Sequence, residues 1–295
     1  MRAAAILGLG YSPKALKPFE TPTSVEWRMG MPASSDEADA ILIFGGDGTI
    51  HRHLNQLARL ALPVLIVPAG SGNDSARALG LRRIRNSLAA WKKFTTGSGN
   101  IRTIDLGTIT SLDGSARNST PATQYFACVA GVGLDTEVAR RANALPRWLR
   151  GHGGYALSLA PSVFSFAPFP MKITTQSEAQ QDDWLLRSNQ PTILAAFANT
   201  PTFGGGMKIA PQAKMDDGLL DICIVRGIDP FKLVCLFPTV YAGKHLGIRG
   251  VEYFHSARAR IETEHPLDIY ADGEYVCRTP AEIGIQAAAL RVIVP

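Results

Sequence analysis

The sequence predicts an α/β lobe followed by a second lobe rich in β-strands. Short apolar runs alternate with helical patterns up to about residue 106, which is typical of a layered α/β domain. From Arg102 onward, short strand patterns with turn residues between them replace this alternation. With 46% hydrophobic and 19% charged residues, the composition of the 295-residue chain supports real cores and argues against disorder.

The first lobe is expected to contain buried parallel strands. Ala3 to Leu9 and Pro63 to Pro68 are short apolar runs, and each predicts a strand. Ile41 to Phe44 is a continuous apolar run, as expected for a strand that is covered on both faces. The apolar residues of Ile50 to Leu62 recur with helical spacing, so a helix is expected there.

A glycine-rich turn follows two of these strands. The first is GGDGT, Gly45 to Thr49, and the second is AGSGND, Ala69 to Asp74. Glycines allow close approach to bare backbone, and a strand, glycine turn and helix together aim N–H groups at a phosphate. A single such turn is explained equally well by a tight connection without a ligand. Two of them at the carboxyl ends of parallel strands favour a ligand site.

The remaining elements are predicted from caps and alternation. Asn73 and Asp74 are expected to cap a helix that runs from Ser75 to Phe94, before a loop at Gly97 to Asn100. The predicted strands of the second lobe are Tyr125 to Val129, Met171 to Thr175, Thr192 to Ala198, Leu219 to Val225, Arg258 to Thr263 and Leu267 to Ala271. The predicted helices are Thr136 to Ala142 and Pro230 to His245, and the predicted exposed loops are Ser111 to Thr123 and Gln176 to Asp183.

Composition narrows the class of function. The four cysteines include no CxxC pair, so reduced, packed thiols are expected rather than a zinc site or a disulfide. The net charge of +5 suits a protein that handles ATP and anionic lipid, and also many that handle neither. No basic-aromatic repeat or zinc-finger spacing favours nucleic acid. The uncharged stretch Gly153 to Met171 contains three prolines and predicts a core helix near Tyr155 to Pro161, or else an apolar surface that helps a lipid leave the membrane.

Four blocks in this order resemble the soluble bacterial diacylglycerol kinases and their sphingosine- and ceramide-kinase relatives. They are GGDGT, PAGSGNDSAR at Pro68 to Arg77, GGGMKIAPQAKMDDGLLDICIV at Gly204 to Val225, and DGEYVCRTP at Asp272 to Pro280. GGDGT alone is shared with NAD kinases. The resemblance implies a nucleotide-binding lobe of residues 1–106, completed by 288–295, and a β-sandwich lobe of residues 107–287. The active site would lie in the cleft between them.

The resemblance also implies which residues bind ATP. They are Gly45, Gly46, Asp47, Gly48, Thr49, Ile50, His51, Gly70, Ser71 and Asn73. From their chemistry, the hydroxyls of Thr49 and Ser71 can donate to phosphate oxygen. Asp47 would repel a phosphate, so it is expected to act through Mg²⁺.

A base must take the proton of the accepting hydroxyl. Asp272 and Glu274 flank Gly273, and at i and i+2 they share a face if the strand continues. Two close carboxylates disfavour joint ionisation, which raises one pKa. The alternative is a plain β-turn with Asp and Gly in their usual places. The resemblance assigns the proton-acceptor role to Glu274, with Asp272 and Asp47 as the other catalytic carboxylates.

KMDDGL, Lys214 to Leu219, is by default a turn. The resemblance implies a Mg²⁺ site there, made by the carboxylate of Asp217 and the backbone carbonyls of Lys214 and Leu219. Hard cations favour such oxygen ligands, and Asp216 is the rival ligand.

Some positions depart from the family pattern. The Asn-Pro turn that usually follows the first strand is replaced by GLGYSPKAL, Gly8 to Leu16. The usual Asn-Glu after GGDGT is replaced by His51-Arg52-His53, whose two histidines do not share a helix face and so predict no metal site. The family's aromatic residue after Asn-Asp is Ser75 here. These changes could alter nucleotide preference or weaken activity.

The expected function is an ATP- and Mg²⁺-dependent lipid kinase of phospholipid synthesis, which most simply converts diacylglycerol to phosphatidate. The protein is expected in the cytoplasm, bound peripherally to a membrane surface. The sequence leaves undecided whether it forms a homodimer. An NAD kinase is the alternative enzyme, disfavoured by the GSGND turn and the DGE…TP ending. A catalytically silent lipid- or nucleotide-binding module is the alternative from another class.

Overall fold

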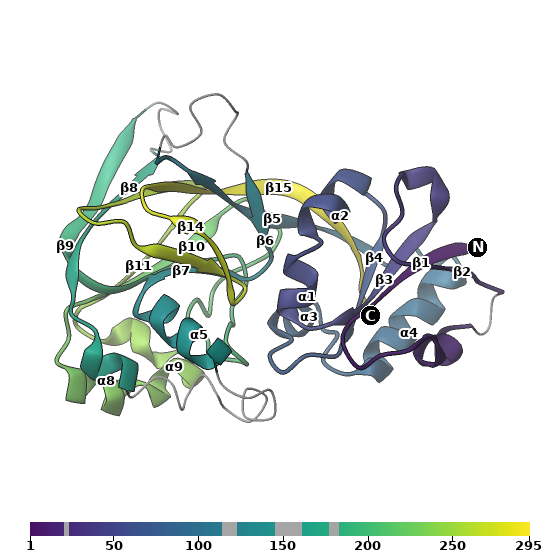
Figure 1. Ribbon diagram of the computed structural model, residues 1–295, viewed down its shortest axis with the longest axis horizontal. Coiled ribbons are helices and arrows are strands. Elements are labelled where there is room, and N and C mark those ends of the chain that lie inside the picture. Colours follow the sequence, from purple (N-terminus) through teal and green to yellow (C-terminus); the bar gives the residue numbers. More distant parts are fainter. Residues whose placement is uncertain (21–23, 114–122, 145–160, 177–182) are drawn as a thin grey trace.

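The computed structural model describes residues 1–20, 24–113, 123–144, 161–176 and 183–295. Two lobes lie side by side, an α/β lobe formed by the start of the chain and a β-sandwich lobe formed by the rest (Figure 1). This is the architecture expected from the sequence. The strands of both lobes belong to one continuous mixed sheet.

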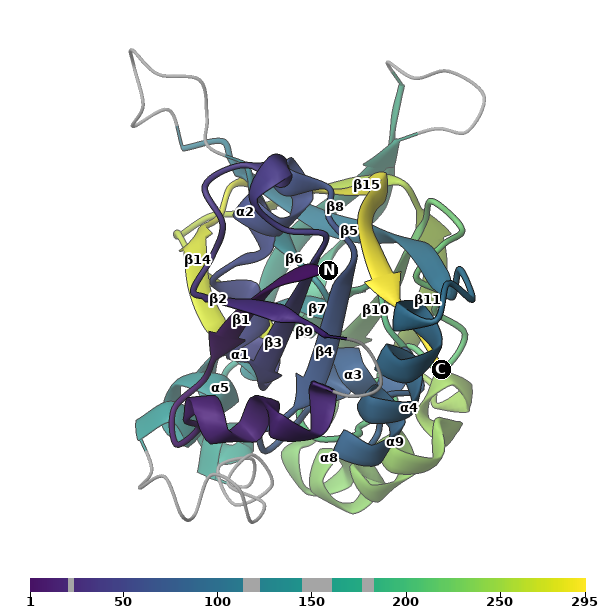
Figure 2. The ribbon, with the colours of Figure 1, turned by 90° about the vertical axis from the view of Figure 1, so that its right-hand side faces the viewer.

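The first lobe is built on four parallel strands in the order β4-β3-β1-β2. Their bounds are β1 Arg2–Leu7, β2 Glu26–Met29, β3 Ala40–Gly45 and β4 Val64–Pro68. All residues of β3 and β4 are buried, which confirms that their continuous apolar runs mark strands covered on both faces. Figure 2 looks onto this lobe, where the strands lie side by side.

The helices of the first lobe are shorter than expected. They are α1 Asp47–His51, α2 Leu54–Leu60, α3 Asp74–Ala78 and α4 Ile84–Thr95, with 3₁₀ helices η1 Pro13–Phe19 and η2 Ser35–Glu37. The single helix expected from Ser75 to Phe94 is wrong, because Gly80 takes a φ of +77° and turns the chain between α3 and α4. The helix expected from Ile50 to Leu62 likewise divides into α1 and α2.

The second lobe contains most of the strands. They are β5 Ile101–Ser111, β6 Gln124–Phe126, β7 Val129–Gly133, β8 Phe169–Gln176, β9 Trp184–Ala198, β10 Leu220–Arg226, β11 Val251–Ser256, β12 Arg258–Thr263, β13 Asp268–Ala271, β14 Glu274–Arg278 and β15 Ala281–Ile293. The one strand expected from Tyr125 to Val129 is wrong, since the chain leaves the ladder at Ala127 and Cys128, whose backbone amides bond elsewhere.

β15 joins the two lobes. Its first half pairs antiparallel with β12, and nearly all of it pairs antiparallel with β5. The register shifts between Gln286 and Leu290, and near its end Val292 pairs with Val64 of β4 in parallel. The strand is seen running from one lobe into the other in Figure 1. The end of the chain therefore completes the sheet of the first lobe.

Helices cover one end of the second lobe. They are α5 Leu134–Ala144, α8 Pro230–Leu236, α9 Pro238–Ala242 and the 3₁₀ helix η3 Lys244–Gly247. The single helix expected from Pro230 to His245 is interrupted at Pro238, which donates no backbone hydrogen bond, and at Gly243, whose φ is +70°. Across the described ranges, no helix is long and apolar enough to cross a membrane.

Some expectations fall on residues that are not described. The helix near Tyr155 to Pro161 lies outside the described residues apart from Pro161 itself, and so does most of each of the two predicted loops. The four cysteines are free, as expected, but Cys235 is exposed rather than packed.

Candidate active site

The two glycine turns lie against each other. β3 and β4 are parallel neighbours, and their register pairs Gly45 with Pro68, so both turns leave the same edge of the sheet. A Cβ built on Gly46 would lie 2.8 Å from the Cα of Gly70, and a Cβ on Gly70 would collide with the Cα of Gly46. Glycine is therefore required at both positions, and the two turns lie together at the carboxyl ends of parallel strands, where the sequence predicts a ligand site.

The first turn presents backbone donors. The amides of Thr49 and Ile50 donate to the carbonyl of Gly46 at 2.9 and 3.1 Å, which starts α1. The amides of Asp47 and Gly48 are the first two of this helix, so they have no acceptor within it and can serve a phosphate. The side chain of Thr49 packs over Gly45, and that of Ile50 is buried in the core. A nucleotide contact by Ile50 would therefore use its backbone.

Asp47 holds the second turn against the first. Its Oδ2 accepts a hydrogen bond from the amide of Asp74 at 3.0 Å, and its Oδ1 accepts from the amide and hydroxyl of Ser75 at 3.0 and 2.7 Å. Burial raises the pKa of this carboxyl, and the bonds from α3 oppose the rise. Asp47 therefore caps α3 in this structure, whereas contact with Mg²⁺ stays a prediction. Ser75, which departs from the family pattern, supplies two of the three donors from α3, and the thiol of Cys128 lies 4.0 Å from Oδ1.

Asn73 closes the second turn. With a φ of +54°, it accepts from the amide of Gly70 through Oδ1 at 2.8 Å and donates to the carbonyl of Gly70 through Nδ2 at 2.5 Å. The expected side-chain cap on the following helix is wrong, because Asn73 makes no such bond and Asp47 takes that place. Ser71 lies exposed at the tip of the turn, where its hydroxyl is accessible.

Asp74 ties the second turn to the other lobe. Its side chain, 3% exposed, accepts from the hydroxyl of Thr202 at 2.8 Å and from the amide of Gly205 at 2.7 Å. Arg77 pairs with the same carboxylate and also donates to the carbonyl of Gly72 at 3.0 Å. The glycine run Gly204 to Gly206 thus lies beside the second glycine turn, where the two lobes meet. Asp74, Arg77 and Thr202 were not predicted as site residues.

The DGE segment forms a tight hairpin. Asp272 and Gly273 join β13 to β14 with φ values of +52° and +85°. A two-residue turn with both φ values positive reverses the chain at once. The expectation that Asp272 and Glu274 share a strand face is therefore wrong, and the turn alternative describes the backbone correctly.

The two carboxylates of this hairpin have different surroundings. Asp272 is buried, and its oxygens accept from the amides of Ala127 and Cys128, both at 2.8 Å. Glu274 is half-buried and reaches the first glycine turn: a Cβ on Gly48 would lie 2.6 Å from its Oε1. Within the described ranges, no other residue forms a hydrogen bond or an ion pair with the side chain of Glu274, whose backbone pairs with Ala271. It is the carboxylate available to accept a proton.

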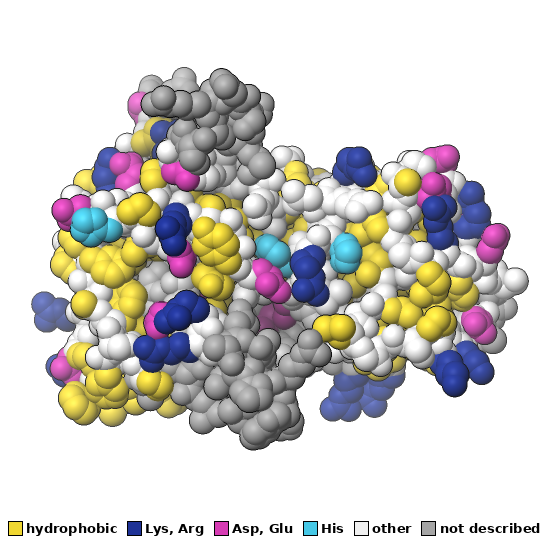
Figure 3. All heavy atoms as spheres, viewed as in Figure 1, with side chains coloured by type: hydrophobic (Ala, Val, Ile, Leu, Met, Phe, Trp, Pro, Cys, Tyr) yellow, Lys and Arg dark blue, Asp and Glu magenta, His cyan; other side chains and the backbone are white. Residues whose placement is uncertain are grey.

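Three carboxylates lie near Cys128 where the lobes meet. Acidic, histidine and basic side chains are seen at this junction in Figure 3. Burial raises the pKa of the Cys128 thiol well above its ordinary value, and the nearby carboxylates of Asp47, Asp272 and Asp74 raise it further. Cys128 is therefore a thiol rather than a nucleophilic thiolate.

The loop Lys214 to Leu219 is held by Asp105, a residue that was not predicted. Asp105 accepts from the amides of Gly218 and Ala288, both at 2.8 Å. Asp216 forms an ion pair with Arg102 at 2.7 Å. Asp217 is exposed and accepts from the amide of Leu219 at 3.1 Å. The only sequence signal for Asp105 is a charge inside an apolar strand pattern.

The oxygen ligands of the loop Lys214 to Leu219 fit a Mg²⁺ site in which the ion keeps several of its waters. The part of the chain that the structure describes contains no cluster of three or more His, Cys, Asp or Glu side chains that could hold a metal ion. Mg²⁺ commonly keeps several waters and binds through one or two carboxylates. Because Asp216 pairs with Arg102, Asp217 is the carboxylate of this loop left for such a hydrated ion, and the carbonyls of Lys214 and Leu219 stay predicted ligands.

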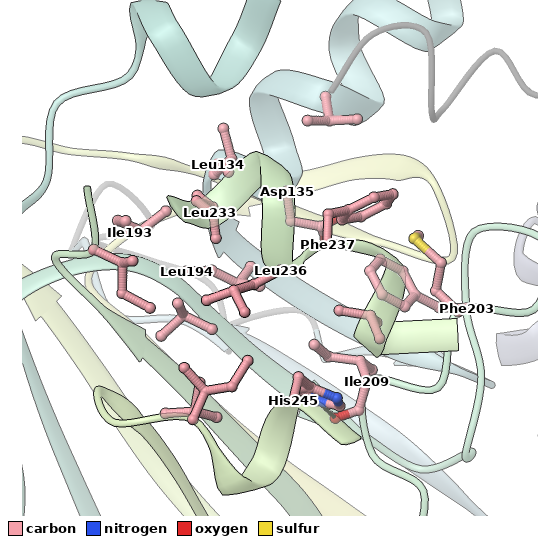
Figure 4. A pocket seen from close by; sticks show the side chains of 17 residues that line it. Leu134, Asp135, Ile193, Leu194, Phe203, Ile209, Leu233, Leu236, Phe237 and His245 are labelled. Carbon is pink, nitrogen blue, oxygen red and sulfur yellow. Dashed lines mark hydrogen bonds between the residues drawn. The ribbon is translucent and has the colours of Figure 1, made fainter. Parts of the chain in front are cut away.

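An apolar pocket lies in the second lobe between the sheet and the helices (Figure 4). It has an empty volume of about 730 Å³, which includes space open to solvent. α8, α9 and the residue between them line its walls with Leu233, Leu236, Phe237 and Val240. Phe203 also lines it and lies two residues before Gly205, which bonds to the second glycine turn through Asp74. The pocket and the cleft are therefore connected by one short loop.

His245 gives this region a pH-dependent stability. It is 3% exposed, and its Nε2 lies 3.1 Å from the carbonyl of Ile209. Burial lowers its pKa below the ordinary 6.5, so below pH 6.5 the unfolded chain binds a proton that the folded chain does not. The free energy of unfolding should fall as the pH drops through this window, by up to about 1.4 kcal/mol per pH unit. Urea titrations between pH 7.5 and 5.5 measure the slope.

The Gln variant isolates this histidine. His245→Gln keeps a donor at the Nε2 position without the titration, so it should flatten the slope. His265→Gln, at an exposed position, should leave the slope as it is. Equal slopes in wild type and His245→Gln would contradict the assignment.

Comparisons with known proteins show the family of the chain. The diacylglycerol kinase catalytic domain matches residues 25–109, and the YegS C-terminal NAD kinase beta sandwich-like domain matches residues 128–294. A diacylglycerol kinase of Mycobacterium tuberculosis (strain CDC 1551 / Oshkosh) is 34% identical over 257 residues, which cover 87% of this chain and 77% of that protein. A diacylglycerol kinase of Bacillus subtilis (strain 168) is 28% identical over 265 residues, which cover 89% of this chain and 80% of that protein.

Solved structures share the fold. A diacylglycerol kinase from Bacillus anthracis superposes with a TM-score of 0.67 at 21% identity, over all of this chain and 97% of that one. An NAD kinase from Archaeoglobus fulgidus in complex with ATP superposes with a TM-score of 0.50 at 17% identity, over 99% of this chain and 93% of that one.

Proposed function

The chain belongs to the lipid kinase family with a diacylglycerol kinase catalytic domain and a YegS-type C-terminal domain, and we propose that it converts diacylglycerol to phosphatidate with ATP. One observation carries this proposal. Glu274 of the second lobe reaches the glycine turn of the first, so a proton acceptor lies opposite a phosphate cradle. A module that only binds nucleotide would not need this carboxylate.

The proposed site residues have three roles, which are phosphate binding, proton transfer and positioning. The amides of Asp47 and Gly48 and the hydroxyls of Thr49 and Ser71 bind the phosphates. Glu274 takes the proton of the lipid hydroxyl. At the same time the hydroxyl oxygen of the lipid bonds to the γ-phosphorus, and the bond from that phosphorus to the leaving ADP breaks. Asp47 and Asp272 position the two sides of the cleft. Mg²⁺, when bound, would neutralise charge on the transferring phosphate.

The lipid tail needs an apolar place. The pocket beneath α8 and α9 has almost entirely apolar walls and adjoins the loop that borders the cleft. We assign it to an acyl chain of the substrate, which the protein would take from a membrane surface on the cytoplasmic side. In this proposal, the first lobe, residues 1–106 with 288–295, binds the nucleotide, and the second lobe, residues 107–287, binds the lipid.

Transfer of labelled phosphate tests the function. The full chain is incubated with labelled ATP, Mg²⁺ and mixed micelles of diacylglycerol, sphingosine, ceramide or phosphatidylglycerol, with NAD as a separate acceptor. The expected result is labelled phosphatidate from diacylglycerol. Label in NADP would show an NAD kinase, and the absence of any transfer would show a silent module.

Filling the pocket should change the choice of lipid. Leu233 lines the pocket from α8, so Leu233→Trp should raise the KM for long-chain diacylglycerol by roughly tenfold, the cost of about 1.4 kcal/mol of lost apolar burial. The KM for a short-chain diacylglycerol should change much less. The neighbouring Lys232→Trp, on the exposed face, is the matched control. An equal effect of Leu233→Trp on both lipids would remove the acyl chain from this pocket.

A further inference from the structure

His51 makes a buried contact between the lobes. It is the last residue of α1, and its Nδ1 lies 3.1 Å from Oδ2 of Asp272, which is 221 positions later in the chain. The two side chains are 9% and 0% exposed, so water hardly reaches the pair. A hydrogen bond to a charged acceptor is stronger than one between neutral groups, and more so away from water.

Asp272 is fixed from both lobes. The amides of Ala127 and Cys128 hold its two oxygens in the second lobe, and the imidazole of His51 reaches Oδ2 from the first. Asp272 is also the first residue of the hairpin turn, and Glu274 follows that turn directly. The position of Asp272 therefore sets where Glu274 stands relative to Gly48.

The contact gives His51 a different task from the nucleotide contact implied by resemblance. Its Nδ1 is used by Asp272, and little of its side chain is exposed to a ligand. Because an aspartate carboxylate only accepts, Nδ1 must carry the hydrogen, whether the ring is neutral or charged. The bond therefore does not depend on the ring being protonated a second time.

We propose that His51 is a positioning residue that fixes Glu274 opposite the first glycine turn by donating from Nδ1 to Asp272. The proposal rests on the function above, in which Glu274 is the base. Without this bond Asp272 keeps its partners in the second lobe, but the hairpin loses its tie to α1. Misplacing a catalytic group by about 1 Å can cost roughly 10²-fold in rate.

Two amide substitutions test the proposal sharply. The side-chain nitrogen of Asn can occupy the place of Nδ1 of the imidazole, whereas that of Gln occupies the place of Nε2. His51→Gln and His51→Ala should lower kcat by about 10- to 100-fold, with a change in the KM for ATP of less than about threefold. His51→Asn should recover at least about a third of the wild-type kcat. Equal loss in the Asn and Gln variants, or no loss in the Gln variant, would overturn the proposal.

A second readout is independent of catalysis. In His51→Gln and His51→Ala, hydrogen exchange should quicken at the amides of Ala127 and Cys128 and in the hairpin, and in His51→Asn it should not. A rise in the KM for ATP with unchanged kcat and exchange would instead make His51 a nucleotide contact. If the wild type transfers phosphate to no lipid, the proposed function fails, and the exchange experiment still decides the role of His51.

Discussion

Replacing Glu274 with glutamine should lower kcat by about 10²- to 10⁴-fold while ATP still binds. The amide keeps the size of the side chain and its approach to Gly48 but cannot take a proton from the lipid hydroxyl. Within the described ranges, the side chain of Glu274 forms no hydrogen bond or ion pair, so the substitution removes no such interaction from the fold. The free energy of unfolding should therefore stay within about 0.5 kcal/mol of the wild type.

Transfer rates in diacylglycerol micelles measure kcat, and a titration with ATP measures the affinity for the nucleotide separately. Glu264→Gln, at an exposed glutamate of the same lobe, is the matched control and should keep its activity. A turnover of Glu274→Gln within about twofold of the wild type would exclude Glu274 as the base.

Replacing Gly70 with alanine should weaken ATP binding by about 10- to 100-fold. Overpacking costs about 1–3 kcal/mol, and each 1.4 kcal/mol or so of lost binding free energy is a factor of ten in affinity. The new Cβ would collide with the Cα of Gly46, which is backbone and cannot rotate away. The two turns must then separate, and the donors of the phosphate cradle separate with them. The free energy of unfolding of Gly70→Ala should also fall, by about 1–3 kcal/mol.

Gly247→Ala is the control for adding a methyl group, because a Cβ there meets nothing within 4 Å. Both variants are compared by ATP titration and by urea unfolding. Normal ATP affinity in Gly70→Ala would show that the contact between the turns does not support nucleotide binding.

The strands next to the cleft could be predicted because burial leaves a local trace. Ile41 to Phe44 and Pro63 to Pro68 are continuous apolar runs, and β3 and β4 are buried along their whole length. The helix expected after the second turn was wrong because apolar spacing continues across Gly80, whose left-handed conformation ends the helical path. β5 and β15 are long because they pair with each other, and such a pairing between distant segments leaves no local pattern.

The candidate site was predictable where glycine marks it. The two turns and the DGE hairpin carry distinctive residues, and the fold brings all three together. The partners of the buried carboxylates could not be predicted, since Asp74 binds Thr202 and Asp272 binds His51 across the two lobes. A polar residue shows its type in the sequence, but its partner is set by packing.

The most direct measurement is a crystal structure of the full chain with Mg²⁺ and a non-hydrolysable ATP analogue. We expect the phosphates to lie against the amides of Asp47 and Gly48 and beside Ser71, with the γ-phosphate facing Glu274. Phosphates bound away from the glycine turns, or a γ-phosphate that Glu274 cannot approach, would contradict this expectation.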